Sequence, residues 1–357
     1  SNPKDNIQFL TFLVAVIKAV HENSDLLRIS VASAGNDHRL GANEAPPAVV
    51  SIFVGDELQA ILDGLESGNM ITKNAKEEFV IAVDALLNFP KDTTDRNRTS
   101  PFAFTGNKFE FRMLGSADSI ACTNTILNTI VANVLCEFAD KLENSTNFSE
   151  DLNKLLKETY IAHKAVIFNG NGYDDAWLKE AEKRGLPNYP STVDALPHYT
   201  DEKNVKMFEK FGVYTKTELE SRTEILLENY LKTLNIEALT MIDMAKKDIL
   251  PTGMKFAKAL TDAVLAKKAA GVDADVELAL ANKVSGLTKS ISAAITELEA
   301  AEAKASAISD VEQSAKSFRY EVMDVMAELR RYADELETIT PSEMWPMPTY
   351  SELLFNI

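Results

Sequence analysis

The stretch NRTSPFAFTGNKFEFRM, residues 97–113, carries a β-strand pattern in its second half. Alternation places Lys108, Glu110 and Arg112 in a row on one face. The other face is apolar and is expected to be buried, with Phe109, Phe111 and Met113. A strand with these two faces can line a cavity that holds a metal ion together with several anions. The alternative for the charged row is a cross-strand ion-pair ladder on a solvated sheet.

A second segment, GNDHRLGANEAPPA, covers residues 35–48 and is rich in Gly, Asn and Pro. This composition predicts a loop, which would carry Arg39 and Glu44 five residues apart. The segment resembles the active-site loop of glutamine synthetases that runs from Arg-Leu to Glu-Ala-Pro. Asn-Arg-Thr at residues 97–99, with the later Glu-x-Arg, resembles the next active-site segment of the same enzymes.

The exact motifs, RLGANEAPPA followed by KFEFR, are similar to the type III branch of that family. The resemblance continues through FNGNGY at residues 168–173, the helical stretch at 219–248 and the closing MPTYSELLF. Several motifs in the same order are more specific than any one of them. The resemblance therefore spans nearly the whole chain.

The resemblance implies an ATP-dependent ligase that joins ammonium to L-glutamate through a γ-glutamyl phosphate intermediate, using two or three Mg²⁺ or Mn²⁺ ions. It implies active sites at the subunit interfaces of a ringed homo-oligomer, two stacked hexamers. It further implies that the chain is the C-terminal part of a longer enzyme and is inactive alone. The missing N-terminal half would supply a small β-grasp domain and most of the metal-binding carboxylates.

The family roles can be placed on matching positions. Glu110 matches a metal-ligand glutamate, while Arg39 and Arg112 match the arginines that hold the substrate glutamate. Arg98 matches a catalytic arginine shared between the nucleotide phosphate and the reacting carboxyl group, and Lys108 stands where a basic nucleotide contact is expected.

Glu44 is the proposed catalytic base, because a carboxylate can attract ammonium and accept its proton. The alternative is that Glu44 caps the helix expected to begin near Pro46. The chain departs from the family pattern at Ala103, where a second arginine is usual. This difference leaves the detailed ATP contacts open.

Hydrophobic periodicity predicts a buried helix over residues 7–20 and a series of long helices after residue 217. Pro251 is expected to end the first of them, and Thr217–Glu220 and Ser309–Glu312 match capping boxes. A 3.5-residue period over residues 274–308 and 309–336 predicts an antiparallel hairpin with coiled-coil packing.

The predicted fold class is α+β and predominantly helical, with few antiparallel strands, packed helices and a long helical-hairpin extension. Residues 1–200 are assigned to the C-terminal portion of a glutamine synthetase catalytic domain. Residues 201–340 are assigned to a helical bundle with the coiled-coil hairpin, and residues 341–357 to a C-terminal tail.

A formal charge of -17 and a pI near 4.8 argue against a nucleic-acid partner. The apolar run at residues 7–20 is shorter than the roughly 20 residues that a membrane span needs. Cys122 and Cys136 are interpreted as buried, reduced thiols of a cytoplasmic protein. The histidines form no zinc motif, and His21, His163 and His198 have no partner at ligand spacing.

Two other functional classes remain open from the sequence. One is another carboxylate–amine ligase or a guanidino-kinase-like enzyme, against which the Asn-Glu-Ala-Pro loop argues. The other is a non-catalytic assembly module, supported by the hairpin at residues 270–340.

Overall fold

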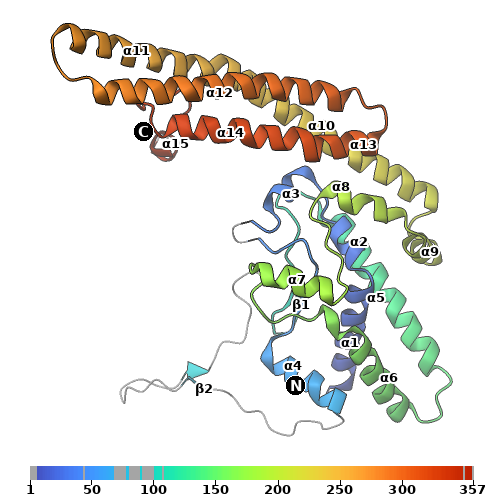
Figure 1. Ribbon diagram of the computed structural model, residues 1–357. Helices are drawn as coiled ribbons and strands as arrows, with labels where there is room; N and C mark the ends of the chain where they lie inside the picture. Colours follow the sequence, from blue (N-terminus) through green and yellow to red (C-terminus); the bar gives the residue numbers. More distant parts are fainter. Residues whose placement is uncertain are drawn as a thin grey trace. The chain divides into compact units, whose positions relative to one another are not determined.

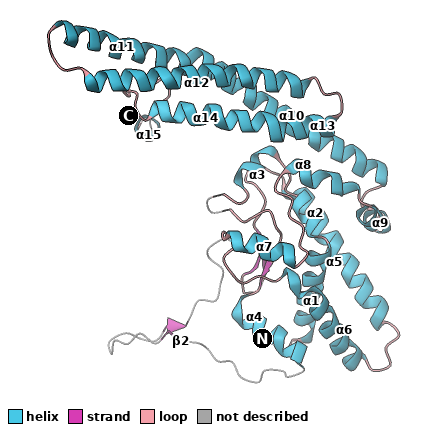
Figure 2. Ribbon diagram, viewed as in Figure 1, coloured by secondary structure: helices cyan, strands magenta, loops and turns pink. Residues whose placement is uncertain are grey.

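Helices dominate the structure, a computed structural model that describes residues 6–42, 45–67, 78–79, 89–90, 100–106, 108–348 and 350–355. In these residues the strands form a three-stranded sheet and a separate two-stranded pair (Figure 2). The predicted class, α+β and predominantly helical, is confirmed. By its internal contacts the chain divides into two compact units, Ser1–Thr223 and Glu224–Ile357.

The first unit contains most of the short helices and the three-stranded sheet. In chain order its helices are α1 (Ile7–Glu22), α2 (Ser24–Ile29), α3 (Ala34–Arg39), α4 (Gly55–Ser67), α5 (Ile120–Leu142), α6 (Phe148–His163), the 3₁₀ turn η2 (Lys164–Val166), α7 (Asp175–Lys183), α8 (Thr192–Ala195), the 3₁₀ turn η3 (Leu196–Thr200) and α9 (Glu202–Lys210).

Helix α1 forms the core of this unit and packs along α5 and α6 (Figure 1). Val14, Ala15 and Ile17 are fully buried, which confirms the buried helix predicted over residues 7–20.

Helix α5 has the length and hydropathy that a membrane span needs, alone among the described helices. Its largest set of contacts is with α1. Cys122 and Cys136 on α5 are free thiols, half-buried rather than fully buried as predicted.

The three-stranded sheet has the order β1–β4–β5, with β1 (Ile52–Phe53) parallel to β4 (Phe102–Phe104) and β4 antiparallel to β5 (Phe109–Phe111). The single strand expected in the second half of residues 97–113 is therefore wrong, because the chain reverses between β4 and β5. Thr105 N donates to Lys108 O at 2.9 Å, and Gly106 supplies a φ of 95° that L-residues rarely adopt.

The reversal changes how the aromatic face is built. Phe102 stacks on Phe109 with ring centroids 4.8 Å apart, so the two strands of the hairpin hold one another through aromatic pairs. Phe109 and Phe111 are half-buried, whereas Met113 is fully buried. The second sheet pairs β2 (Glu78–Phe79) with β3 (Phe89–Pro90), antiparallel.

All secondary-structure elements in the described residues of the second unit are helices. It takes in most of α10 (Lys216–Met244) and then, in chain order, the π-helical segment η4 (Ala245–Ile249), α11 (Leu250–Ala269), α12 (Asp275–Ser306), α13 (Val311–Ser317), the π-helical segment η5 (Phe318–Val322), α14 (Met323–Glu337) and the short α15 (Tyr350–Leu354).

Helices α11, α12 and α14 lie side by side (Figure 1). This arrangement confirms the predicted helical-hairpin extension. The buried stripe of α12 follows the predicted periodicity and includes Val284, Leu287, Ile291, Ala294, Leu298 and Ala305.

Three predicted helix boundaries in this region are wrong. Pro251 does not end a helix, because η4 precedes it and Leu250 N bonds back five residues to Ala245 O. A π-helical turn next to a proline lets the helix continue without the missing N–H.

The capping boxes are also shifted. Glu218 accepts from Thr215 N at 2.8 Å while Glu218 N donates to Thr215 Oγ1 at 3.3 Å, two residues earlier than predicted. The later helix is capped by Asp310, which accepts from Gln313 N at 2.8 Å. Both are N-terminal caps, so the predicted type of signal is right and only its position differs.

Candidate functional site

The charged row on β5 forms as predicted. Glu110 lies between two cations: Lys108 Nζ is 3.2 Å from Glu110 Oε1, and Arg112 Nη2 is 3.3 Å from Glu110 Oε2. The hydrogen bond from Lys108, followed by the one from Arg112, lowers the pKa of Glu110 below its ordinary value of 4.5. Glu110 is therefore an anion at neutral pH and a suitable oxygen ligand for a hard cation.

Exposure differs along the row. The side chain of Lys108 is 65% exposed, that of Glu110 39% and that of Arg112 only 14%. The Lys108–Glu110 pair is thus a surface ion pair, of the kind that contributes about 0 to 1 kcal/mol to stability. These two ion pairs join neighbouring positions of one segment, residues 108–112, rather than residues of two strands.

Arg39 reaches the same place from a different element. The loop predicted for residues 35–48 is wrong at its start, because residues 34–39 form α3, with Ser33 Oγ accepting from Asn36 N at its N-terminus. Arg39 is the last residue of α3. Its Nη1 donates to Met113 O at 2.9 Å and its Nη2 to Arg112 O at 3.0 Å. The structure thus joins two predicted glutamate ligands, Arg39 and Arg112, by a direct contact.

Three further positions were singled out in the sequence: Glu44, Arg98 and Ala103. Glu44 and Arg98 lie outside the described residues. Ala103, where the family pattern has an arginine, pairs directly with Glu110 across the β4–β5 ladder and is fully buried. Directly opposed residues of an antiparallel pair share one face of the sheet, so the position of the departure borders the charged row.

The described residues hold a single carboxylate of the predicted metal site. Among them, no group of three or more His, Cys, Asp or Glu side chains could hold a metal ion. Glu110 fits Mg²⁺ or Mn²⁺ as one oxygen ligand, and a complete site needs further ligands from elsewhere.

Sequence reasoning missed a pair of histidines. His21 of α1 and His163 of α6 were predicted to have no partner, yet their Nδ1 atoms lie 2.9 Å apart. Glu22 adds a carboxylate 3.7 Å from His163 Nε2. The two histidines are 142 positions apart in the chain, so no local spacing could have revealed the pair.

Comparison with known proteins agrees with this geometry. Residues 151–268 match the family described as the glutamine synthetase C-terminal domain. The whole chain is 41% identical to a glutamine synthetase of Butyrivibrio fibrisolvens and covers 51% of that protein. The chain is similar to glutamine synthetases along its whole length. It is also 39% identical to a type-3 glutamine synthetase of Dictyostelium discoideum and to a glutamine synthetase of Bacteroides fragilis (strain YCH46), of which it covers 49% and 50%.

The chain spans about half the length of these relatives. Within this chain, the FNGNGY motif makes hydrogen bonds that hold the fold together. Asn169 Oδ1 accepts from Val54 N at 3.0 Å and from Gly55 N at 3.1 Å, which ties the motif to the start of α4. Through Asn169, the segment that follows α6 is thus bonded to the start of α4.

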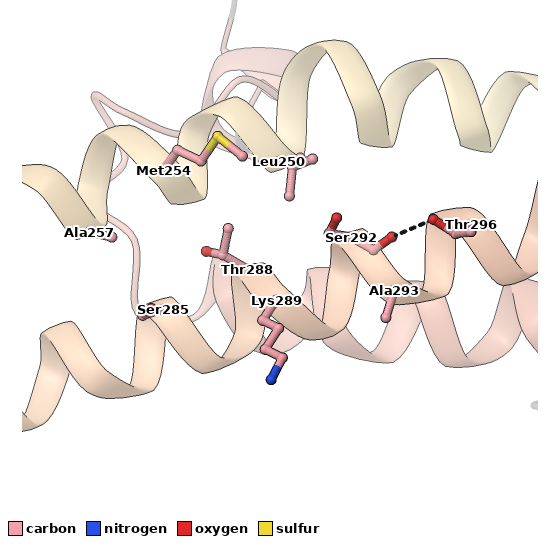
Figure 3. Close-up of a pocket in the computed structure, with 9 residues that line it drawn as sticks. All are labelled: Leu250, Met254, Ala257, Ser285, Thr288, Lys289, Ser292, Ala293 and Thr296. Atoms are coloured by element: carbon pink, nitrogen blue, oxygen red, sulfur yellow. Dashed lines mark hydrogen bonds between the residues drawn. The ribbon is translucent and has the colours of Figure 1, made fainter.

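An open groove runs between α11 and α12 in the second unit (Figure 3). Leu250 of α11 points toward α12 and Thr288 of α12 points toward α11, while Lys289 points away from α11 (Figure 3). The lining residues are Leu250, Met254, Ala257, Ser285, Thr288, Lys289, Ser292, Ala293 and Thr296. None of the positions matched to glutamine synthetase roles belongs to this unit, so the groove is not part of the candidate site.

Proposed function

We propose that the chain is the C-terminal half of a type III glutamate–ammonia ligase, which makes L-glutamine from L-glutamate, ammonium and ATP. The observation that carries this proposal is the identity of about 40% along the whole chain to proteins named glutamine synthetase. The contact between Arg39 and the backbone of Arg112 and Met113 supports it, because it joins two of the matched segments.

Arg39 and Arg112 are proposed to hold the carboxylates of glutamate. A guanidinium has five N–H donors. Arg39 directs three of them to Asn36 Oδ1, Met113 O and Arg112 O. Two N–H donors of Arg39 remain, one on Nη2 and one on Nε. They are neighbours and match the two oxygens of a carboxylate. The backbone contacts would fix the direction in which this pair points.

The proposed reaction has two steps. The terminal phosphoryl group of ATP moves to the γ-carboxylate of glutamate and gives γ-glutamyl phosphate and ADP. Ammonia then attacks the carbonyl carbon of the γ-glutamyl phosphate, and phosphate leaves as the C–N bond forms. Arg98 is proposed to contact both the phosphate and the reacting carboxyl group, and Lys108 the nucleotide, because fixed cations stabilise charge that moves between phosphate and carboxylate.

A divalent cation, Mg²⁺ or Mn²⁺, would neutralise part of the phosphate charge when bound. Glu110 would hold it as an ionised carboxylate. Its own pair of cationic neighbours keeps it ionised, and its half-exposed side chain leaves room for ligands from the rest of the protein.

Glu44 is proposed to attract ammonium and to accept its proton before the attack. In the full-length enzyme, Glu44→Gln should lower glutamine formation by roughly 10²-fold or more, the scale expected for loss of a general base, while ATP binding and folding are kept. Turnover close to that of the unchanged enzyme, with a lower melting temperature, would instead show that Glu44 caps a helix. Product analysis with other amines in place of ammonium separates this ligase from other carboxylate–amine ligases.

The assembly proposed for the full-length enzyme is a cytoplasmic homo-oligomer of two stacked hexameric rings. In this assignment residues 1–200 belong to the catalytic domain, residues 201–340 form a bundle with coiled-coil packing, and residues 341–357 form a tail. An assembly role for the bundle alone is the second candidate, favoured by the long helices that are the only secondary-structure elements in the described part of the second unit.

A further inference from the structure

The short helix α3 carries Arg39 at its last position, so the contacts that hold α3 also hold this arginine. Six residues are too few for a stable isolated helix. The orientation of α3 must therefore come from side chains that contact the rest of the unit. Two neighbouring polar residues make these contacts: Asn36, which is 2% exposed, and Asp37, whose side chain is 4% exposed.

Asn36 ties α3 to the segment after β5. Its Nδ2 donates to Val31 O at 2.8 Å and to Met113 O at 2.9 Å, and its Oδ1 accepts from Arg39 Nη1 at 3.1 Å. These bonds connect one side of the helix to the charged row and orient the guanidinium of Arg39.

Asp37 ties α3 to the opposite part of the unit. Its Oδ1 accepts from Arg28 Nη2 at 3.0 Å and from Thr192 Oγ1 at 2.8 Å, and its Oδ2 accepts from Thr192 N at 2.7 Å. Arg28 is 1% exposed and donates through Nε to Tyr189 O at 2.8 Å. One buried carboxylate thus joins α2, α3 and the first residue of α8.

This arrangement is sensitive to the loss of a single partner. A buried ion pair is kept only when good geometry and additional hydrogen bonds offset the removal of both charges from water. Thr192 supplies two of those bonds from a position 155 residues away. Asp37 itself bonds to α2 and α8 and reaches Arg39 only through the backbone of α3.

We propose that Asp37 is a positioning residue of the glutamate-binding site. Together with Arg28 and Thr192 it fixes α3, so that Arg39 meets the backbone of Arg112 and the chain enters residues 40–42 in a fixed direction. The inference rests on the proposed function, which assigns glutamate to Arg39 and Arg112.

The test uses the full-length enzyme with Thr192→Val, which removes the hydroxyl donor but keeps the N–H bond to Asp37. The KM for glutamate should rise roughly three- to tenfold, because small misplacements of a binding group weaken substrate binding. The KM for ATP should stay within about twofold of its original value. Thr192→Ser, which restores the hydroxyl, should return the KM for glutamate close to normal.

Thr129→Val is the matched control. Thr129 is 5% exposed, and its hydroxyl donates to Thr125 O at 2.7 Å within α5, so this variant loses a buried hydroxyl away from α3. It should leave the KM for glutamate unchanged. An unchanged KM for glutamate in Thr192→Val, or equal rises in both KM values, would overturn the proposal.

A second measurement is independent of the reaction. The amides of Leu40 and Gly41 bond to Asn36 O and Pro46 O, each at 2.9 Å, and their hydrogen exchange reports how firmly α3 and its exit are held. Exchange should be faster in Thr192→Val than in Thr129→Val. If the full-length protein makes no glutamine, the proposed function fails, and faster exchange still supports the positioning role. Unchanged exchange contradicts that role with or without activity.

Discussion

Glu110 is an ionised carboxylate that solvent can reach. The hydrogen bond from Lys108, and then the one from Arg112, lowers its pKa further below the ordinary value, and its side chain is 39% exposed. An ionised carboxylate that water can reach is able to exchange one of its cationic neighbours for a metal ion. A metal role for Glu110 therefore requires Lys108 or Arg112 to give up its contact with the carboxylate.

Replacing this carboxylate tests the metal assignment. In the full-length enzyme, Glu110→Gln should raise the Mg²⁺ concentration needed for half-maximal activity by at least roughly tenfold, since a charged ligand is lost. Glu180→Gln is a matched control, because Glu180 pairs with Arg184 at 2.9 Å on α7 and belongs to no proposed site. An unchanged Mg²⁺ titration in Glu110→Gln would refute the metal role.

The histidine pair predicts a dependence of stability on pH. Burial lowers the pKa of His21 and of His163 below 6.5, although Glu22 acts in the opposite direction. Lys18 and Glu137 also face the pair and oppose one another. Since the folded protein binds fewer protons than the unfolded chain below about pH 6.5, the free energy of unfolding should decrease as pH falls through that value.

Urea unfolding at about pH 7.5 and about pH 5.5 measures this effect. The double variant His21→Asn/His163→Asn should lose less stability between the two values than the original protein. His198→Asn serves as the control, because His198 is a half-buried histidine that pairs with Asp201 away from the two others. An equal loss of stability in the double variant and the original protein would show that other groups cause the pH dependence.

At the level of elements, Gly253 sets how closely α11 approaches α12. A Cβ at this position would lie 2.6 Å from Thr288 Oγ1 and 3.2 Å from Leu336 Cδ2. The hydroxyl of Thr288 is held by its bond to Val284 O at 2.7 Å and cannot easily move aside. The steric clash in Gly253→Ala should therefore lower the free energy of unfolding by about 1 to 3 kcal/mol. The higher helix propensity of alanine should offset about 1 kcal/mol of this loss.

Denaturant midpoints measure this change. Gly286→Ala is the matched control: nothing lies within 4 Å of its Cβ position in α12, so it should stabilise the protein by up to about 1 kcal/mol. Adding Thr288→Ala to Gly253→Ala should recover part of the loss. A stabilising effect of Gly253→Ala alone would mean that the two helices can separate at little cost.

The elements also show which features of the fold can be predicted from the sequence. The row on β5 was predicted because strand alternation is a local property, and the long helices because their apolar periods repeat many times. The reversal at Gly106 was missed because the predicted strand was continued through Gly106, a residue that commonly marks a turn, although the apolar alternation itself begins only at Phe109. Contacts such as Asp37–Thr192 were missed because nothing in either local sequence indicates a partner 155 residues away.

At the scale of the whole molecule, the chain covers about half of its relatives, and its described residues provide one proposed metal ligand. The purified chain alone should form no glutamine from glutamate, ammonium and ATP, because phosphoryl transfer needs several ligands positioned together. Glutamine formation by the chain alone would contradict the division of the site between two halves.

Sizing the same preparation against the full-length protein separates the two candidate functions. An inactive chain that still forms a defined oligomer would support an assembly role for the helical unit. An inactive monomer would mean that the subunit contacts of the full-length enzyme require its other half.

The π-helical segments η4 and η5 bear on how this sequence can change during evolution. A π turn contains one residue more than an α turn, so each segment amounts to a single-residue insertion accommodated inside a continuous helix. Deleting one residue from Ala245–Ile249 would let the segment close into ordinary α turns, so the later side chains of α11 would keep their directions around the helix axis. Relatives without these turns should align with this chain only through one-residue gaps at the two places, and such gaps inside a helix would record where it was lengthened without being broken.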